Sequence, residues 1–364
     1  MKPAEQLNQF GQSAWLDLIG RKMIESGELL RMSKEDGVRG VTANPAIFEK
    51  AIVESHDYDD ELKAGKEKTP LQVYEAIAIG DVRAACDVLR PLFDRWKGND
   101  GFVSLEVSPE IARDTAATLT EAKRFWSAVD RPNLLVKIPA NPAGIPAIRA
   151  ATAAGISVNI TLIFSCTVYE QVMEAYLSGL EERAASGLDL SKIHSVASFF
   201  VSRVDTLVDK LLEEKGTPEA KALLGKIAVA NAKEAYQRFL KVVESPRWKA
   251  LQAKGATRQR PLWASTGTKN KAYSDVLYVE TLIGQDTVNT LPLATLKAFN
   301  EHGKVAQTIT SGVAEARAQL AQLSKVGIDL EKVCSQLTEE GLELFTKALR
   351  GLLGAIGGKA GSGH

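Results

Sequence analysis

One lysine inside an apolar segment is the residue whose type and setting most strongly indicate chemistry. Lys137 lies in the run LLVKIP. Side chains alternate between the two faces of a strand, so Lys137 lies opposite its apolar neighbours Val136 and Ile138. If that apolar pair packs outward, the amine points into a shielded interior, where an unpaired ammonium is costly. A lysine that loses its proton there can attack a ketone and form an iminium, which permits carbon–carbon cleavage.

Carboxylates and amides in other strand-like runs have the same expected orientation. In VSLEV, Glu106 alternates with apolar residues and is expected to face the interior. In VNITLIF, Asn159 and Thr161 alternate with apolar residues in the same way. The same rule groups Asp17 with Trp15, Asn44 with Thr42, and Ser265 with Trp263, and it leaves Ser198 unassigned.

Imine chemistry requires acid–base partners beside the amine. Forming the imine needs an acid to expel water, and breaking the carbon–carbon bond needs a base for the departing hydroxyl proton. Asp17 and Glu106 could divide these tasks. No metal or other cofactor is expected, because the four histidines are far apart and none lies in a spacing typical of a metal site. The sequence therefore argues against a zinc-dependent aldolase.

Two short segments could bind an anion near these residues. Ser202 and Arg203 follow one strand-like run, and STGTK from Ser265 to Lys269 follows the next. A glycine-containing turn with hydroxyls, backbone amides and a lysine suits a sugar phosphate, and late loops of barrel enzymes often bind phosphate. The segment is not a P-loop, because the G-x-x-x-x-G-K-[ST] spacing is absent.

The elements that must position these residues alternate between short β-rich runs and longer helical segments. This alternation predicts parallel β/α units, and eight of them close a barrel. We therefore expect an α/β fold of the (β/α)8 class. The eight runs are SAWLDL from Ser13, GVRGVTANP from Gly37, GFVSLEV from Gly101, NLLVKIP from Asn133, SVNITLIF from Ser157, HSVASFFV from His194, PLWAST from Pro261 and DTVNTLP from Asp286.

Two helical regions exceed what a simple barrel needs. Residues 69–96 predict two helical pieces separated at Gly80, within an unusually long second connection. Residues 293–353 are amphipathic, with Gly303, Gly312 and Gly327 as breaks, and are expected to cap the barrel mouth. We expect one domain over residues 1–355 and a flexible Gly-rich tail over residues 356–364.

Composition excludes several function classes. The chain has 364 residues, and its 45 basic and 45 acidic residues cancel, so neither nucleic acid nor a membrane surface is an expected partner. Three separated cysteines indicate core residues in a reducing compartment, without a disulfide framework. No apolar segment resembles a membrane span or a leader. We expect a cytoplasmic protein, and the sequence leaves a homodimer open.

Each candidate residue also has an ordinary structural interpretation. A lysine that ends a strand is most often solvated, and the two carboxylates could pair with basic residues for structure alone. Asn44 could serve only as a turn residue before a proline. Arg203 could pair with Asp205, and Lys269 could be a loop charge. Trp263, like other buried aromatic residues, is more often a core residue than a ligand contact.

Taken together, the segments resemble the transaldolase family, in its bacterial branch. The resemblance extends from the first strand-like run through the closing helices, and it implies a barrel of the class I aldolase type. The most specific matches are VTANPAIF around Asn44, LLVKIPA around Lys137, NITLIFS around Thr161, SFFVSR around Ser198 and WASTGTKN around Ser265. The chain is also similar to the transaldolase half of fusions with glucose-6-phosphate isomerase, without the isomerase portion.

The resemblance implies a role for each matching residue. Lys137 would form a Schiff base, Asp17 would act as acid and base in cleavage, and Glu106 would activate a water held with Thr161. The remaining matches imply substrate contacts: Asn44, Asn159 and Ser198 to hydroxyls, Phe200 beside the intermediate, and Arg203, Ser265 and Lys269 at the phosphate. Lys269 stands where another branch has arginine, which replaces a bidentate contact by a point charge. Lys271 stands where relatives often have proline.

The implied reaction transfers a dihydroxyacetone unit from sedoheptulose 7-phosphate to glyceraldehyde 3-phosphate, giving erythrose 4-phosphate and fructose 6-phosphate in the pentose phosphate pathway. Two alternatives stay open. One is a fructose 6-phosphate aldolase that releases free dihydroxyacetone, which an acceptor-independent rate would reveal. The other is a non-catalytic barrel that binds sugar phosphates, against which the joint presence of Lys137, Glu106 and Asp17 argues.

Overall fold

The protein is a closed barrel of eight parallel strands in sequence order. The computed structural model describes residues 1–65 and 67–361. Each strand pairs with its sequence neighbours, and the last pairs with the first. This confirms the predicted (β/α)8 fold, and every strand overlaps one of the eight predicted runs. The strands are β1 (Gln12–Leu16), β2 (Val38–Val41), β3 (Phe102–Glu106), β4 (Leu134–Pro139), β5 (Val158–Ile163), β6 (Ser195–Phe200), β7 (Gln259–Ala264) and β8 (Thr287–Leu291).

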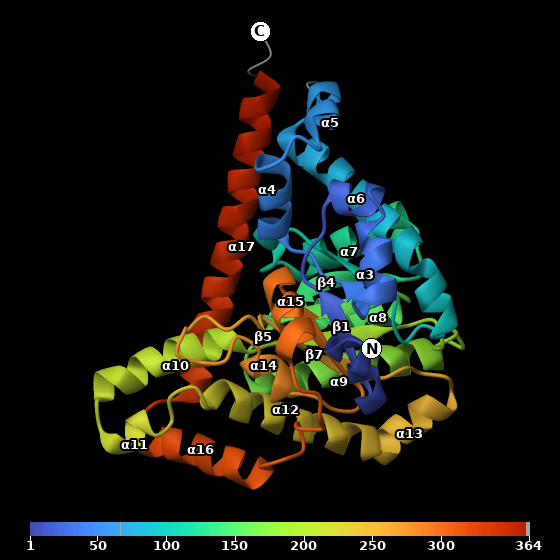
Figure 1. Cartoon of the computed structure of the whole chain (residues 1–364). Helices are drawn as coiled ribbons and strands as arrows, with labels where there is room; N and C mark the ends of the chain where they lie inside the picture. The colour runs from blue at the N-terminus through green and yellow to red at the C-terminus, as the bar shows by residue number, and fades with distance from the viewer. Residues whose placement is uncertain (66, 362–364) are drawn as a thin grey trace.

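Helices surround this barrel on its outer side (Figure 1). They bury the outward apolar side chains of the strands, as parallel strands require on both faces. No helix in the described part of the chain has the length and apolar character needed to cross a membrane. The helices are α1 (Pro3–Gln6), η1 (Leu7–Phe10), α2 (Arg21–Glu25), α3 (Glu28–Glu35), α4 (Pro45–Val53), α5 (Asp59–Ala64), α6 (Pro70–Arg95), η2 (Pro109–Ile111), α7 (Thr115–Val129), α8 (Gly144–Ala153), α9 (Cys166–Ala185), α10 (Ser202–Lys215), α11 (Pro218–Lys221), α12 (Ile227–Glu244), α13 (Pro246–Ala253), α14 (Leu277–Glu280), α15 (Leu293–His302), α16 (Val313–Lys325) and α17 (Leu330–Gly361).

The last helix of the long second connection is continuous, so the predicted break at Gly80 is wrong. Helix α6 runs through Gly80 without interruption. A glycine inside a helix costs only about 1 kcal/mol relative to alanine. The apolar face on both sides of Gly80, including Ile77 and Val82, is buried and outweighs that cost. Thr69 and Gln72 begin the helix with a reciprocal capping box.

The register of the central strands brings three polar residues to one level. Glu106 of β3 lies beside Lys137 of β4, and Lys137 lies beside Asn159 of β5. In parallel pairs, side chains at matched positions point to the same face. The three side chains therefore share one layer of the barrel interior, as the alternation of residues predicted.

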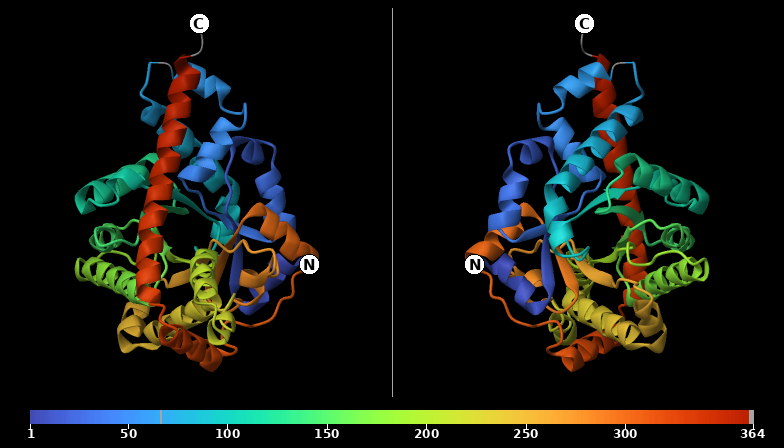
Figure 2. Two further views of the ribbon diagram at one scale, coloured as in Figure 1. Left: turned by 90° about the vertical axis from the view of Figure 1, so that its left-hand side faces the viewer. Right: turned by 90° about the vertical axis from the view of Figure 1, so that its right-hand side faces the viewer.

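The C-terminal helices end where the glycines predicted and extend across the barrel. Gly303 ends α15, Gly312 precedes α16 with a φ of 66°, and Gly327 separates α16 from α17 with a φ of 80°. Helix α17 then runs as one straight segment past the barrel from α10 to α4 and α5 (Figures 1 and 2). The role of these helices as a cap over the barrel mouth stays a prediction.

The expected flexible tail is partly helical. Helix α17 continues to Gly361, because Ile356 packs into the core with 1% of its surface exposed. Apolar packing therefore carries the helix into the glycine-rich segment. Residues 362–364 lie outside the described residues. The assignment of one domain to residues 1–355 stays a prediction.

The three cysteines are free and buried, as the sequence predicted. Cys86, Cys166 and Cys334 lie in the core. Burial raises the pKa of the Cys166 thiol to about 12, which leaves it protonated and unsuited to nucleophilic chemistry.

We expect α17 to be held to the barrel mainly by its apolar face. Leu352 is 0% exposed and Leu344 is 53% exposed on the same helix. Leu352→Ala should lower the free energy of unfolding by about 2–5 kcal/mol, because it leaves a cavity. Leu344→Ala should change it by about 0.5 kcal/mol or less. Denaturant unfolding of both variants checks this, and equal effects would contradict the packing of α17.

Candidate active site

A cavity of about 190 Å³ opens at the carboxyl ends of the strands. Barrel enzymes place their chemistry at this end. The cavity is lined by every residue predicted for the site except Glu106 and Asn159, and each of these two contacts a lining residue, Lys137 or Ser198. Its lining is Asp17, Thr42, Asn44, Lys137, Thr161, Ser198, Phe200, Arg203, Ala264, Ser265, Gly267, Lys269, Thr290, Pro292 and Phe345.

The amine of Lys137 has three neighbours inside the barrel. Lys137 Nζ lies 3.1 Å from Glu106 Oε2, and both side chains are 5% exposed. Nζ also donates to the carbonyl of Ala43 at 3.1 Å. The ring of Phe345 lies 5.6 Å from Nζ, within range of a cation–π contact. The amine thus points inward, is paired with a carboxylate and is largely shielded from solvent.

Two carboxylates face this amine, and burial raises the pKa of both. Burial raises the pKa of Glu106 above its ordinary value of 4.5, and the charge of Lys137 opposes the shift. Burial likewise raises the pKa of Asp17 above 3.8, against the attraction of Lys137 and a hydrogen bond from Thr42. Thr42 Oγ1 lies 2.7 Å from Asp17 Oδ1. Carboxyl groups with raised pKa values are suited to gain and lose protons near neutral pH.

A chain of hydrogen bonds supports the floor of the cavity. Asn159 donates from Nδ2 to Ser104 Oγ at 2.9 Å and accepts from Ser198 Oγ at 2.7 Å. Ser198, whose orientation the alternation left open, therefore faces the interior. Thr161 also faces the cavity, and its buried Oγ1 has no hydrogen-bond partner among the described residues. That hydroxyl can bind a water or a ligand atom.

Asn44 both caps a helix and lines the cavity. Its Oδ1 accepts from the amide of Ile47 at 3.0 Å and caps the N-terminus of α4. Because the oxygen is engaged, the Nδ2 amide group is the part left to donate into the cavity. The helix cap therefore fixes which end of the side chain a ligand meets.

Cationic groups lie at the outer part of the cavity. Arg203 is the second residue of α10, and its guanidinium lies 5.5 Å from the ring of Phe200. Burial lowers the pKa of Arg203, and Asp17 partly opposes this shift. Among the described residues, no carboxylate lies within ion-pair distance of Arg203 or Lys269. The alternative partner Asp205 instead accepts from the amide of Ala228 and from Tyr278.

The loop after β7 reaches the cavity through an unusual backbone conformation. Ser265 has a φ of 54°, and its Oγ lies 3.0 Å from Ser202 Oγ. This turn changes the alternation, so the predicted shared face of Ser265 and Trp263 is wrong. Trp263 packs on Phe199, which also contacts Tyr169 of α9, and therefore lies on the helix side of the sheet.

Thr290 and Phe345 are among the cavity residues that were not predicted. Thr290 of β8 bonds Thr42 at 2.6 Å, and alternation along DTVNTLP could have indicated its orientation. Phe345 comes from α17, more than a hundred residues after the lysine that it covers. No local pattern distinguishes it from the other apolar residues of an amphipathic helix.

Fold and site together define a (β/α)8-barrel protein with a buried amine–carboxylate pair and a cationic rim at the carboxyl ends of the strands. The sequence model of the family described as Transaldolase/Fructose-6-phosphate aldolase matches residues 14–356, and this chain belongs to that family. Curated relatives named "Transaldolase" include one from Thiobacillus denitrificans, 48% identical over 98% of this chain and 100% of its own length. One from Trichodesmium erythraeum is 46% identical over 96% of each chain. "Transaldolase 2" of Streptomyces avermitilis is 49% identical over 96% of this chain and 95% of its own.

We expect Asp17→Asn to stabilise the protein at neutral pH. The folded-state pKa of Asp17 is raised above 3.8, so ionisation of Asp17 disfavours folding once the pH exceeds that value. Below about pH 3.8 the carboxyl is protonated in both states, and this contribution disappears. The thermal midpoint of the variant should therefore exceed that of the wild type at pH 7, and the gap should narrow toward pH 4. The exposed Asp57→Asn serves as control; a gap independent of pH would contradict the assignment.

Proposed function

We propose that this protein is a transaldolase that moves a dihydroxyacetone unit from sedoheptulose 7-phosphate to glyceraldehyde 3-phosphate. The products are erythrose 4-phosphate and fructose 6-phosphate, as in the pentose phosphate pathway. The observation that carries the proposal is the amine of Lys137, 3.1 Å from Glu106 inside the cavity. Family membership and the names of full-length relatives support the same reaction. A cytoplasmic location and a homodimer stay predictions.

The proposed chemistry begins at the lysine. The unprotonated amine of Lys137 adds to the ketone carbon of the sugar phosphate, and loss of water gives an iminium. Glu106, through a water held at the free Thr161 hydroxyl, supplies and removes the protons of this dehydration. The ion pair between Glu106 and the amine supports this role, because the acid–base group must act close to the atom that loses water.

Carbon–carbon cleavage then uses Asp17. Asp17 accepts the proton of the hydroxyl next to the breaking bond, while the bond electrons move into the iminium and leave an enamine on Lys137. The first aldehyde departs. In the reverse sense, the enamine attacks the carbonyl carbon of the acceptor aldehyde, and Asp17 returns its proton to the new alkoxide. A raised pKa suits Asp17 to both directions.

The remaining site residues would orient the substrate. The Nδ2 group of Asn44 and the hydroxyl of Ser198 face the cavity and would bind hydroxyls, with Phe200 beside the intermediate. Asn159 is fully buried and hydrogen-bonded to Ser198, so its contribution would pass through that hydroxyl as well. Holding the hydroxyls fixes the geometry of the bond that breaks.

The phosphate group would lie at the outer rim. Within the part of the chain that the structure describes, Arg203 and Lys269 have no carboxylate partner there, and Ser265 adds a hydroxyl next to the turn. A guanidinium and an ammonium together match the charge of a phosphate monoester. Phosphorylated sugars are thus the proposed substrates.

The lysine adduct tests this proposal directly. Treatment with fructose 6-phosphate and borohydride should trap a three-carbon unit on the peptide that contains Lys137, and Lys137→Met should show none. Adding erythrose 4-phosphate before the borohydride should remove the three-carbon unit from Lys137 by transfer to this acceptor. An adduct that decays equally fast without an acceptor would favour the aldolase alternative. Mass spectrometry that finds no adduct on Lys137 would refute the covalent mechanism.

We expect Lys269 to act on binding of phosphorylated substrates. Lys269→Ala should raise their KM about tenfold, the size of one lost charge-assisted contact, with a much smaller change in kcat. Lys271→Ala removes a charge from the same loop outside the cavity and is the matched control. Steady-state kinetics of both variants decide the point. An unchanged KM in Lys269→Ala would remove this residue from the phosphate site.

A further inference from the structure

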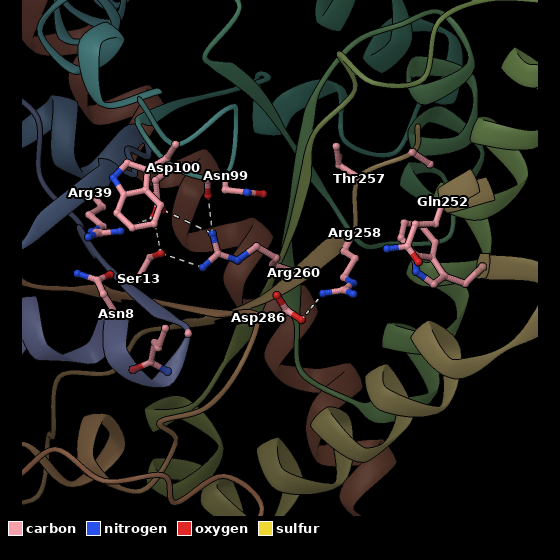
Figure 3. Close-up of a pocket in the computed structure, with 15 residues that line it drawn as sticks. Asn8, Ser13, Arg39, Asn99, Asp100, Gln252, Thr257, Arg258, Arg260 and Asp286 are labelled. Carbon is pink, nitrogen blue, oxygen red and sulfur yellow. Dashed lines mark hydrogen bonds and ion pairs between the residues drawn. The ribbon is translucent and has the colours of Figure 1, made fainter. Parts of the chain in front are cut away.

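A second and larger cavity lies at the opposite end of the barrel (Figure 3). Its volume is about 410 Å³, within the range of small-molecule sites. It lies at the amino ends of the strands. Ser13, Arg39 and Arg260, which line it, are each the second residue of their strands β1, β2 and β7. No residue of the candidate active site lines it.

Three arginines face this cavity with only two carboxylates. Arg258 pairs with Asp286 at 2.5 Å. Arg39 and Arg260 share one carboxylate, Asp100, at 3.4 and 3.5 Å. One positive charge is therefore left over at the wall of the cavity. Figure 3 shows Arg260 in the middle, with Arg39 and Asp100 on one side and Arg258 and Asp286 on the other.

Neutral donors already satisfy the shared carboxylate. Ser13 Oγ lies 2.7 Å from Asp100 Oδ2, and Trp15 Nε1 lies 3.0 Å from Asp100 Oδ1. These bonds are shorter than either ion pair to Asp100. Arg39 thus receives only a long contact from an acid that two other groups hold in place, and it retains donors for a further anion. The terminal nitrogens of Arg260 are already hydrogen-bonded, so this residue contributes its charge.

The cationic groups are held in fixed positions. Arg260 donates to the carbonyls of Asn99 at 2.6 Å and Thr287 at 2.7 Å and to Ser13 Oγ at 2.8 Å. The guanidinium of Arg39 lies 4.0 Å from the ring centre of Trp96, a stacking contact. Groups fixed in advance lose little entropy when a ligand binds, which favours affinity.

Two further observations indicate that positive charge and a hydrogen-bond donor are left without an anionic partner among the described residues. Burial lowers the pKa of Arg39; Asp100 opposes the shift, and the neighbouring charges of Arg260 and Arg95 add to it. The Nε of Arg258 is buried without a hydrogen-bond partner among the described residues. A bound oxyanion would compensate the excess charge and accept from a free donor.

We infer that this cavity is a binding site for a small phosphate monoester. The phosphate lies at the guanidiniums of Arg39 and Arg258, whose forked donors match its oxygens, and Arg260 adds a neighbouring positive charge. The cavity is much larger than a phosphate ion, and polar side chains line its remainder, including Asn8, Gln252 and Thr257. These groups bind hydroxyls of the organic part. The site is separate from the proposed transaldolase chemistry and does not depend on it.

Calorimetric titration with glycerol 3-phosphate and, separately, with inorganic phosphate tests this site. To remove binding at the opposite end, the titrations use the Arg203→Gln, Lys269→Gln double variant as background. In that background the ester should bind, and more tightly than inorganic phosphate. Adding Arg39→Gln and Arg258→Gln should weaken the ester about tenfold or more. Arg90→Gln, which removes an exposed arginine paired with Asp94, should leave the affinity unchanged.

Other outcomes would overturn the inference. Equal affinity for the two probes would show that the cavity does not recognise an ester. Absence of binding in the background variant would show that the arginines serve only as an ion-pair cluster at the strand ends. If the arginine variants fail to fold, modification of the wild type by phenylglyoxal decides. Glycerol 3-phosphate should protect Arg258 and not Arg90, and equal labelling of Arg258 with and without the ester would refute the site.

Discussion

The ion pair between Lys137 and Glu106 is the interaction on which the rest of the site depends. The two residues are matched across β3 and β4, and their side chains are 5% exposed. Removing two charges from water offsets much of their mutual attraction, so such a pair adds little net stability. Losing one partner is different, because it leaves an uncompensated buried charge that typically costs about 3–5 kcal/mol. The barrel can therefore hold the amine in its charged form only while the carboxylate stays beside it.

The surroundings of this pair follow from the same constraint. Burial raises the pKa of both Glu106 and Asp17, and nearby positive charges oppose the shift. The Ala43 carbonyl takes one donor of the amine, and the ring of Phe345 covers it. Each of these contacts thus offsets part of the desolvation cost of a neighbouring buried group. The balance leaves two carboxyl groups able to exchange protons, which the proposed imine chemistry uses in two different steps.

Most of the barrel and the inward orientation of its polar residues could be predicted from the sequence. Short β-rich runs between turn residues identified the strands, and alternation identified Lys137, Glu106 and Thr161 as facing inward. The predictions that were wrong depend on tertiary packing and backbone turns, which local sequence patterns do not show. Gly80 was compatible with a continuous helix because tertiary burial exceeded its small helix penalty. Trp263 was assigned to the wrong face because a turn at Ser265 interrupts the alternation.

Contacts between distant segments could not be predicted for a related reason. Phe345 is one apolar residue among many on α17, and only the path of that helix across the barrel brings it to Lys137. Likewise, the arginines at the amino end come from two distant segments, with Arg39 in β2 and both Arg258 and Arg260 at the start of β7. Sequence patterns indicate which face a residue occupies. They do not indicate which distant residue it meets there.

Helix α17 is part of the site rather than a separate cover. Leu162, next to Thr161, has a φ of 58°, a conformation that costs an ordinary residue about 1–3 kcal/mol. Gly341 of α17 packs directly on it, and a Cβ there would lie 2.7 Å from Leu162 Cδ2. The helix therefore contacts the distorted end of β5 through Gly341. One turn later, its Phe345 covers the amine of Lys137. Because both contacts come from one helix, the orientation of Thr161 and the shielding of Lys137 depend on the same packing.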